Sequence, residues 1–159
     1  MKRVWAPWRM EYLEGTKPPG CIFCFDASQD DERLVLRREE HAFVILNLYP
    51  YTNGHIMVVP SQHLRRPYLL KPDAQQALHQ LLMRSIQVIE EHYGCDGVNV
   101  GMNLGKVAGA GVDDHVHYHI VPRWNGDHNF MPVLADCRVI SQHLDDTFLQ
   151  LKPRFAWSA

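Results

Sequence analysis

Three histidines occupy alternate positions in the stretch His115-Val116-His117-Tyr118-His119-Ile120-Val121, with apolar or aromatic residues between them. Because successive side chains of a β-strand point to opposite faces, this period of two predicts a strand that presents all three imidazoles on one face. The residues between the histidines then point to the other face, where they pack. The chain must fold so that one face of this strand is buried and the other is a polar site.

A run of small residues precedes this strand. Residues 103–111 read Asn-Leu-Gly-Lys-Val-Ala-Gly-Ala-Gly. The lack of large side chains lets backbone N–H groups approach an anion. A row of histidines beside such a loop indicates phosphate chemistry.

Three interpretations of the histidine row remain open at this point. Alternate histidines on a strand can chelate a metal ion with an open coordination position, as in zinc hydrolases. They can also act as nucleophile and acid–base groups in phosphoryl or nucleotidyl transfer. The third interpretation is a set of buried structural histidines, which gives no reason for three of them to share one face beside a loop.

Composition excludes several classes of protein. The 159 residues are 46% apolar and 21% charged, which is typical of one soluble globular domain. A net charge of −2 without a basic run argues against binding a nucleic acid polymer. No apolar run reaches the ~20 residues of a membrane helix, and the N-terminus lacks the apolar core of a signal peptide. We therefore expect a cytoplasmic protein without membrane association.

Local patterns predict an α+β fold. Apolar and β-branched runs predict further strands at 34–36, 42–46, 54–59 and 98–102, and short turns favour antiparallel pairing. Asp73 is expected to cap a helix that ends near Gly94. The apolar residues that recur at helical spacing in this helix are Leu78, Leu81, Leu82, Ile86 and Ile89.

A final amphipathic segment spans 139–151 and stops before Pro153. Near the other end, Pro18-Pro19-Gly20 ends a segment that begins at Met1. We therefore expect an N-terminal arm at 1–20 and a single domain at 21–159.

Two further motifs accompany the histidine row. Asn47 stands eight residues before His55, with a turn between two predicted strands, and Asn103 followed by Gly105 opens the small-residue loop. Together with the alternating histidines, these motifs resemble the histidine triad (HIT) family of nucleotide hydrolases and nucleotidyl transferases. The resemblance runs from about Cys21 to Arg123. It implies an antiparallel sheet of about five strands with a crossing helix and a C-terminal helix, usually doubled in a homodimer.

The resemblance implies a role for each histidine of the row. His117 is the expected nucleophile, which attacks the α-phosphorus of a nucleotide and holds a covalent nucleotidyl group. Its other nitrogen is expected to bond a backbone carbonyl in the loop, which fixes the tautomer. His119 is expected to contact the phosphate and assist the leaving group, and His115 completes the catalytic row.

The resemblance also implies substrate-binding residues. Asn47 is the ribose candidate, because its amide can bond both hydroxyls. His55 either orients the triad or is merely buried and hydrogen-bonded. Phe43, Leu46 and Leu48 either line the base pocket or pack in the core. The residues expected to stabilise charge on the phosphate are Asn103, Gly109, Ala110 and Gly111.

A close cysteine pair indicates a metal site. Cys21 and Cys24 have the two-residue spacing of a zinc knuckle, although two thiols do not complete a tetrahedral site. The alternative is a reduced pair without metal. In HIT relatives that have this pair, the positions of His63 and His115 bind zinc. The resemblance therefore implies a structural Cys2His2 zinc, and we expect no organic cofactor.

Two details narrow the expected reaction. Trp5-Ala6-Pro7-Trp8-Arg9-Met10-Glu11-Tyr12 and the later Asn125-Gly126-Asp127-x-Asn129-Phe130 resemble a bacterial HIT branch that includes diadenosine tetraphosphate phosphorylases. Many HIT hydrolases carry Gln followed by Ser or Thr where this chain has Ala110 and Gly111. This chain also has one extra residue between that position and His115. The difference removes side-chain donors and favours a transferase whose second substrate, inorganic phosphate, brings its own charge. Lys106 either helps to bind that phosphate or is a solvated loop residue.

The expected reaction is therefore phosphorolysis of diadenosine tetraphosphate to ADP and ATP. One alternative is a HIT-type hydrolase of dinucleoside polyphosphates or nucleoside phosphoramidates. A second is a metal-dependent hydrolase with zinc on the triad itself. A third is a non-catalytic, nucleotide-binding regulatory module.

Overall fold

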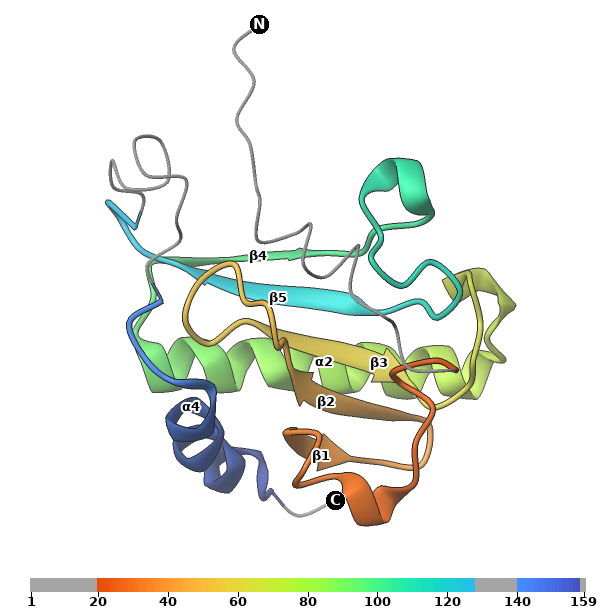
Figure 1. The fold of residues 1–159 in the computed structure, drawn as a ribbon, viewed down its shortest axis with the longest axis horizontal. Coiled ribbons are helices and arrows are strands. Elements are labelled where there is room, and N and C mark those ends of the chain that lie inside the picture. Colours follow the sequence, from red (N-terminus) through yellow and green to blue (C-terminus); the bar gives the residue numbers. More distant parts are fainter. Residues whose placement is uncertain (1–19, 128–139, 158–159) are drawn as a thin grey trace, which may run out of the picture.

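The computed structural model describes residues 20–127 and 140–157. Its centre is a five-stranded antiparallel sheet in the order β1-β2-β3-β5-β4 (Figure 1). The strands are β1 (Val35–Arg38), β2 (Ala42–Leu46), β3 (Ile56–Pro60), β4 (Gly97–Gly101) and β5 (Tyr118–Arg123). The α-helices are α2 (Pro72–Tyr93) and α4 (Leu144–Leu151), and the 3-10 turns are η1 (Ala27–Gln29), η2 (Pro67–Leu69), η3 (Lys106–Ala108) and η4 (Lys152–Phe155).

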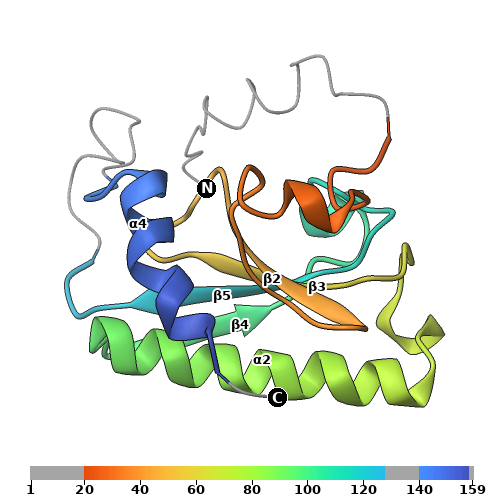
Figure 2. The same cartoon turned by 90° about the horizontal axis from the view of Figure 1, so that it is seen from below.

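The two faces of the sheet are covered differently. Helix α2 crosses one face, while the segment after residue 20 and the loop that carries η3 lie over the other (Figure 2). Alternate residues of β2 and β3, among them Val44 and Val58, pack with Leu78 and Leu82 of α2. This arrangement confirms the predicted α+β class, the antiparallel sheet and the crossing helix.

Helix α2 begins two residues earlier than a cap at Asp73 would require. Pro72 occupies the first turn, where its missing N–H costs no hydrogen bond, and Lys71 precedes it without a side-chain cap. Asp73 therefore lies inside the first turn, where its carboxylate accepts from the N–H of Ala74 at 2.9 Å and faces the positive end of the helix. The expectation that Asp73 caps the helix was wrong. The expected end is confirmed, because Gly94 adopts φ +54° as the C-terminal cap.

Strand β5 starts at Tyr118, so His115 and His117 precede it, contrary to the prediction of a strand from residue 115. The cause is a change of hydrogen-bond partner. The N–H of Val116 donates to the carbonyl of Leu64 at 2.7 Å, whereas β5 pairs with β3 only from Tyr118 to Ile120. The first two histidines therefore pack against the segment that follows β3.

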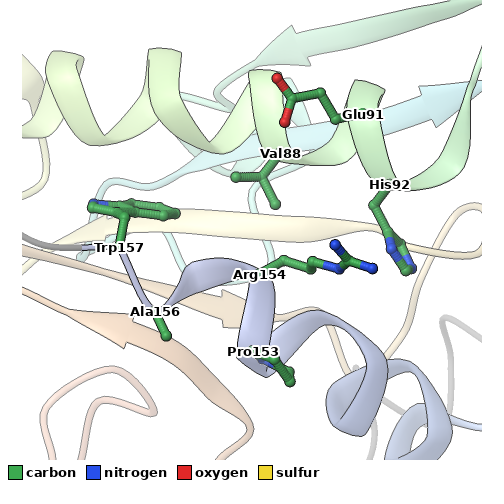
Figure 3. A pocket seen from close by; sticks show the side chains of 7 residues that line it. All are labelled: Val88, Glu91, His92, Pro153, Arg154, Ala156 and Trp157. Carbon is green, nitrogen blue, oxygen red and sulfur yellow. The ribbon is translucent and has the colours of Figure 1, made fainter.

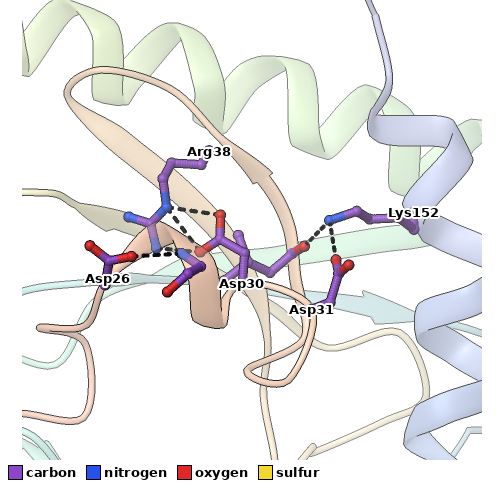
Figure 4. A network of polar contacts seen from close by, with 7 residues as sticks. Asp26, Asp30, Asp31, Arg38 and Lys152 are labelled. Carbon is purple, nitrogen blue, oxygen red and sulfur yellow. Dashed lines mark hydrogen bonds and ion pairs between the residues drawn. The ribbon is translucent and has the colours of Figure 1, made fainter.

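The segment after residue 20 is tied to the sheet by charged side chains (Figure 4). Arg38 of β1 binds both carboxylate oxygens of Asp30, with Nη2 to Oδ1 at 2.6 Å and Nε to Oδ2 at 2.9 Å. Lys152 of η4 bonds Asp31 at 3.1 Å and the carbonyl of Val35 at 2.7 Å. These contacts hold residues 20–33 on the face of the sheet that is opposite to α2.

The ends of the chain bear on two predictions. The N-terminal arm at 1–20 lies outside the described residues except for Gly20, as does the first residue of the segment predicted from 139. The described part of that segment contains α4, which ends at Leu151 before Pro153, as predicted. The turn η4 follows and includes Pro153. Among the helices described, none combines the length and the apolarity needed to cross a membrane. The cytoplasmic location stays a prediction.

Candidate active site and metal cluster

The histidine row lies on the face of the sheet opposite to α2. His119 is directly opposite Met57 in the β3–β5 ladder, and Met57 packs with Phe43 and Val59 in the apolar cluster of that face. His115 and His117 are buried, and His119 is half-buried. The period of two therefore brings the three histidines to one face of the molecule, although only the last lies in the strand.

His117 has one nitrogen committed to the backbone. Its Nδ1 lies 2.9 Å from the carbonyl oxygen of His115. Because a carbonyl can only accept, Nδ1 carries the proton and Nε2 keeps its lone pair. Burial lowers the pKa of His117 below its usual 6.5, which favours this neutral form. The expected backbone acceptor is present, but it belongs to the row itself and not to the glycine loop.

His119 has the opposite tautomer, and His55 determines it. The N–H of Tyr51 donates to Nδ1 of His55 at 3.0 Å, so the proton of the neutral His55 ring is on Nε2. This Nε2 lies 2.9 Å from Nδ1 of His119 and donates to it. The remaining proton of His119 is therefore on its Nε2. Burial, with the nearby His117, lowers the pKa of His119 to about 4, so the ring is neutral at pH 7.

Asn47 lies beside this pair of imidazoles. Its Oδ1 accepts from the N–H of Tyr49 at 2.9 Å, and its Nδ2 is 3.3 Å from Nε2 of His55. The turn between β2 and β3 thus brings together Asn47, His55 and His119, in line with what the resemblance implies. The aromatic ring of Tyr51, which no motif indicated, stacks on His119 with centroids 5.9 Å apart.

The small-residue loop joins β4 to β5 beside the row. Gly101, at the end of β4, is opposite His119 in the ladder, and the loop begins two residues later (Figure 1). The side chain of Asn103 donates to the carbonyl of Gly109 at 3.4 Å, which closes the loop on itself. Gly109 adopts φ +87°, a conformation that favours glycine. Ala110 and Gly111 follow it and are half-buried, whereas Lys106 is exposed.

The three apolar candidates for a base pocket are not brought together. Phe43 is buried on the histidine face, where its ring contacts Phe25 with centroids 5.6 Å apart. Leu46 is buried in the cluster on the other face, against α2, so its assignment to a base pocket was wrong. Residues three apart on a strand point to opposite faces, which explains the separation. Leu48 is 59% exposed beyond the end of β2.

Phe23 is a contact of the row that sequence reasoning missed. Its ring is 5.0 Å from that of His117 and 5.4 Å from that of His115, centroid to centroid, and it is buried. Its position between the two cysteines was the only available signal. A contact between segments 94 residues apart depends on the path of the whole chain, which no local pattern encodes.

The four predicted metal ligands lie together. Sγ of Cys21 is 3.3 Å from Nδ1 of His115, and Sγ of Cys24 is 3.3 Å from Nδ1 of His63 and 3.7 Å from Nδ1 of His115. All four ligand atoms lie within 4.8 Å of one another. A tetrahedral zinc, with bonds of about 2.1 Å to nitrogen and about 2.3 Å to sulfur, separates its ligand atoms by about 3.3 to 3.8 Å. The cluster could therefore hold a metal ion of this size.

The protonation of His115 agrees with metal binding. Its Nε2 lies 2.8 Å from the carbonyl of Pro60, so Nε2 is the donor and Nδ1 presents its lone pair to the cysteines. Desolvation by burial raises the pKa of Cys21 to about 11, so a cation would be needed to hold it as a thiolate. Both ring nitrogens of His115 are engaged and the ring is fully buried. His115 therefore offers no atom to a substrate, and its inclusion among the catalytic residues was wrong.

The rings of the row do not converge on one metal ion. His115 faces the cysteines, His117 bonds a carbonyl through Nδ1, and His119 bonds His55. Among the described residues, the cluster of Cys21, Cys24, His63 and His115 is the only group of three or more potential ligands found. This geometry argues against the alternative of a zinc ion on the triad itself.

A separate hollow of about 390 Å³ lies between α2 and η4 (Figure 3). Val88 and His92 of α2 face Arg154 and Trp157 across it. Since α2 covers the other face of the sheet, this hollow is not part of the histidine site.

Comparison with known proteins places the chain in one family. The HIT domain model matches residues 28–126. The AP-4-A phosphorylase of Mycobacterium tuberculosis is 36% identical over 157 residues, which cover 92% of this chain and 80% of that protein. The bis(5'-adenosyl)-triphosphatase of Dictyostelium discoideum is 37% identical over 84 residues, which cover 53% of this chain and 56% of that protein.

Solved structures show the same fold. A zinc-bound histidine triad family protein from Mycobacterium smegmatis superposes with a TM-score of 0.68 and 26% sequence identity, over 86% of this chain and 93% of that chain. The domain match covers more than half of the chain, and the mycobacterial phosphorylase matches most of its length. The alternating histidines and these matches together show that the chain belongs to the histidine triad (HIT) family.

Proposed function

We propose that this protein is a nucleotidyl transferase that cleaves dinucleoside polyphosphates through a covalent nucleotidyl-His117 intermediate. The observation that carries the proposal is a set of hydrogen bonds that assigns opposite tautomers to two neighbouring histidines of the row. His117 keeps a lone pair on Nε2, whereas His119 keeps a proton there. Support also comes from two relatives whose names specify bis-adenosyl polyphosphate substrates.

The first step joins the nucleotide to the protein. Nε2 of His117 attacks the α-phosphorus, and an N–P bond forms as the bond from phosphorus to the leaving polyphosphate oxygen breaks. The Nε2–H of His119 donates a hydrogen bond to this oxygen, which carries the developing negative charge. In the second step an acceptor oxygen attacks the same phosphorus, the N–P bond breaks and His117 recovers its lone pair.

The substrate contacts follow from the positions of the remaining residues. Asn47 is the proposed ribose ligand, and His55 orients His119 through their hydrogen bond. Phe43 and Leu48 are the proposed base contacts. The phosphate is proposed to meet the loop residues Asn103, Gly109, Ala110 and Gly111.

Inorganic phosphate is the proposed acceptor, which makes the reaction a phosphorolysis of diadenosine tetraphosphate. The proposal rests on the named activity of the mycobacterial relative and on the lack of side-chain donors at Ala110 and Gly111. An acceptor that is itself an anion could bind the backbone N–H groups of the glycine loop, with Lys106 near by.

The acceptor can be identified by chromatography of the products with and without inorganic phosphate. We expect ADP and ATP from diadenosine tetraphosphate when phosphate is present. Formation of AMP and ATP at the same rate in both mixtures would show that water is the acceptor and the protein is a hydrolase, as the name of the Dictyostelium relative would suggest.

We also propose that Cys21, Cys24, His63 and His115 bind one zinc ion. When bound, the ion would be structural, because four protein ligands close its coordination shell. The loop between the cysteines carries Phe23, whose ring packs on His117. The metal cluster would thereby hold the segment that packs on the nucleophile.

A homodimer is proposed through the outer edge of β4. In the described part of the chain, β4 pairs with β5 on one side alone, and Val100 on this strand is 42% exposed. An unpaired strand edge is a template for a second copy of the same strand.

A further inference from the structure

Tyr51 contacts both histidines of the donor pair. It lies in the turn between β2 and β3, and its backbone N–H bonds Nδ1 of His55. Its ring centroid is 4.6 Å from that of His55 and 5.9 Å from that of His119, and its plane is tilted by 26° from the latter. The side chain is 40% exposed, so it lies at the rim of the site.

The turn that carries Tyr51 is fixed on several sides. Oγ1 of Thr52 donates to the carbonyl of Pro122 at 3.0 Å, and Nδ2 of Asn53 donates to Oε1 of Gln142 at 3.1 Å. Gly54 adopts φ +75°, and a side chain there would collide with the ring of Tyr93. The position of Tyr51 is therefore set by the surrounding fold.

The hydrogen-bond direction depends on this arrangement. A neutral His55 ring donates to His119 through Nε2 when its Nδ1 is unprotonated, and this is the form in which Nδ1 accepts from the Tyr51 N–H at 3.0 Å. Nδ2 of Asn47 lies farther from the same Nδ1, at 3.4 Å. Rotation of either imidazole would break the hydrogen bonds from Tyr51 to His55 and from His55 to His119. His119 could then present a lone pair to the substrate. The ring of Tyr51 covers both imidazoles and opposes such a rotation.

We propose that Tyr51 is a positioning residue, whose N–H and ring together hold His55 and His119 so that His119 is a hydrogen-bond donor towards the substrate. The expected effect of Tyr51 on kcat rests on the proposed function. Its expected effect on the tautomers of His55 and His119 does not. Tyr51 acts on the reaction only through His119.

The kinetic test is a double-mutant cycle with diadenosine tetraphosphate as substrate. Tyr51→Leu should lower kcat about tenfold and change KM less than about twofold, because misplacement of a donor weakens transition-state contacts. Tyr51→Phe keeps the ring and should retain kcat within about twofold. In a His119→Ala background, Tyr51→Leu should change kcat less than about twofold, since the residue that it positions is gone.

A tenfold loss in both backgrounds, or a rise in KM alone, would overturn the inference, since Tyr51 would then contact the substrate directly. The matched control is Tyr68→Leu. Tyr68 is a 72% exposed tyrosine in η2, at the other end of the sheet, and its replacement should leave both constants unchanged (Figure 1).

Nitrogen NMR of the metal-loaded native protein tests the same inference without turnover. Long-range proton–nitrogen correlations should show the proton on Nε2 in both His55 and His119, and on Nδ1 in His117. A proton on Nδ1 of His119 would overturn the inference even if turnover were normal. An inactive protein with the expected tautomers would instead contradict the proposed function and leave the role of Tyr51 standing.

Discussion

His117 and His119 are two positions apart, and their different hydrogen-bond partners give them different chemical roles. The carbonyl of His115 accepts a hydrogen bond from Nδ1–H of His117, whereas Nε2–H of His55 donates to Nδ1 of His119. Near pH 7 an isolated imidazole exchanges its proton between both nitrogens, so the distinction depends on these fixed partners. Assignment of nucleophile and donor therefore follows from hydrogen bonds and not from residue type.

The low pKa of His119 predicts how its contribution depends on pH. With a pKa of about 4, the ring stays neutral from pH 8 down to about pH 5, and protonation below that would break the bond from His55. The ratio of kcat/KM between the native protein and His119→Ala should therefore be constant over this range. Steady-state kinetics of both proteins at each pH would check this, because effects common to both cancel. A ratio that changes with a midpoint near 6.5 would contradict the burial of His119.

At the scale of the elements, the site joins three segments that are distant in sequence. The β2–β3 turn carries Asn47 and His55, and the segment after residue 20 carries Phe23. The histidine row spans the residues just before β5 and its second residue, His119. The segment after residue 20 contributes Cys21 and Cys24 to the group of four potential metal ligands. It is also attached through the ion pair between Asp30 and Arg38 (Figure 4). If the four ligands bind zinc as proposed, its removal should loosen the segment that carries Phe23 and leave the sheet formed.

Metal analysis should find about one zinc per chain in protein purified without chelator. Cys24→Ser should lower the zinc content and the melting temperature, because the metal contributes folding free energy, while the chemical rate falls less. Cys95→Ser is the matched control, since Cys95 is a half-buried free cysteine that packs against the core beside α2. Native protein with no zinc, or equal effects of the two substitutions on zinc content, would refute the assignment.

The sequence predicted some of the residues of the site and missed others. The resemblance to the HIT family placed Asn47 and His55 beside the histidine row, while strand alternation predicted only that the three histidines share a face. Alternation also separates Phe43 from Leu46, so their joint assignment to one pocket conflicted with the pattern. Phe23 and Tyr51 could not be found in this way, because ring packing across the sheet depends on the tertiary path of the chain.

At the scale of the whole molecule, the main apolar core and the candidate site lie on opposite faces of the sheet. One face packs on α2 and forms the larger apolar core, and the other carries the histidines under two irregular segments (Figure 2). Binding and catalytic residues often lie on loops that a rigid scaffold positions. Substitution of a residue at the rim of the site, such as Tyr51, should therefore change activity with little effect on the stability of the fold.

The covalent intermediate tests the central claim most directly. Native protein would be mixed with diadenosine tetraphosphate without phosphate, quenched in alkali because a phosphorus–nitrogen bond to histidine is labile in acid, and digested for mass spectrometry. His117→Ala is the control, and its circular dichroism and nucleotide binding should stay close to those of the native protein, because the substitution removes one buried ring.

We predict a mass increase of one AMP unit on the peptide that contains His117, located on that residue by fragmentation and absent from His117→Ala. Added phosphate should discharge it with release of ADP. Turnover of diadenosine tetraphosphate by His117→Ala at more than a small fraction of the native rate, or an adduct located on His119, would contradict the assignment of His117 as the nucleophile.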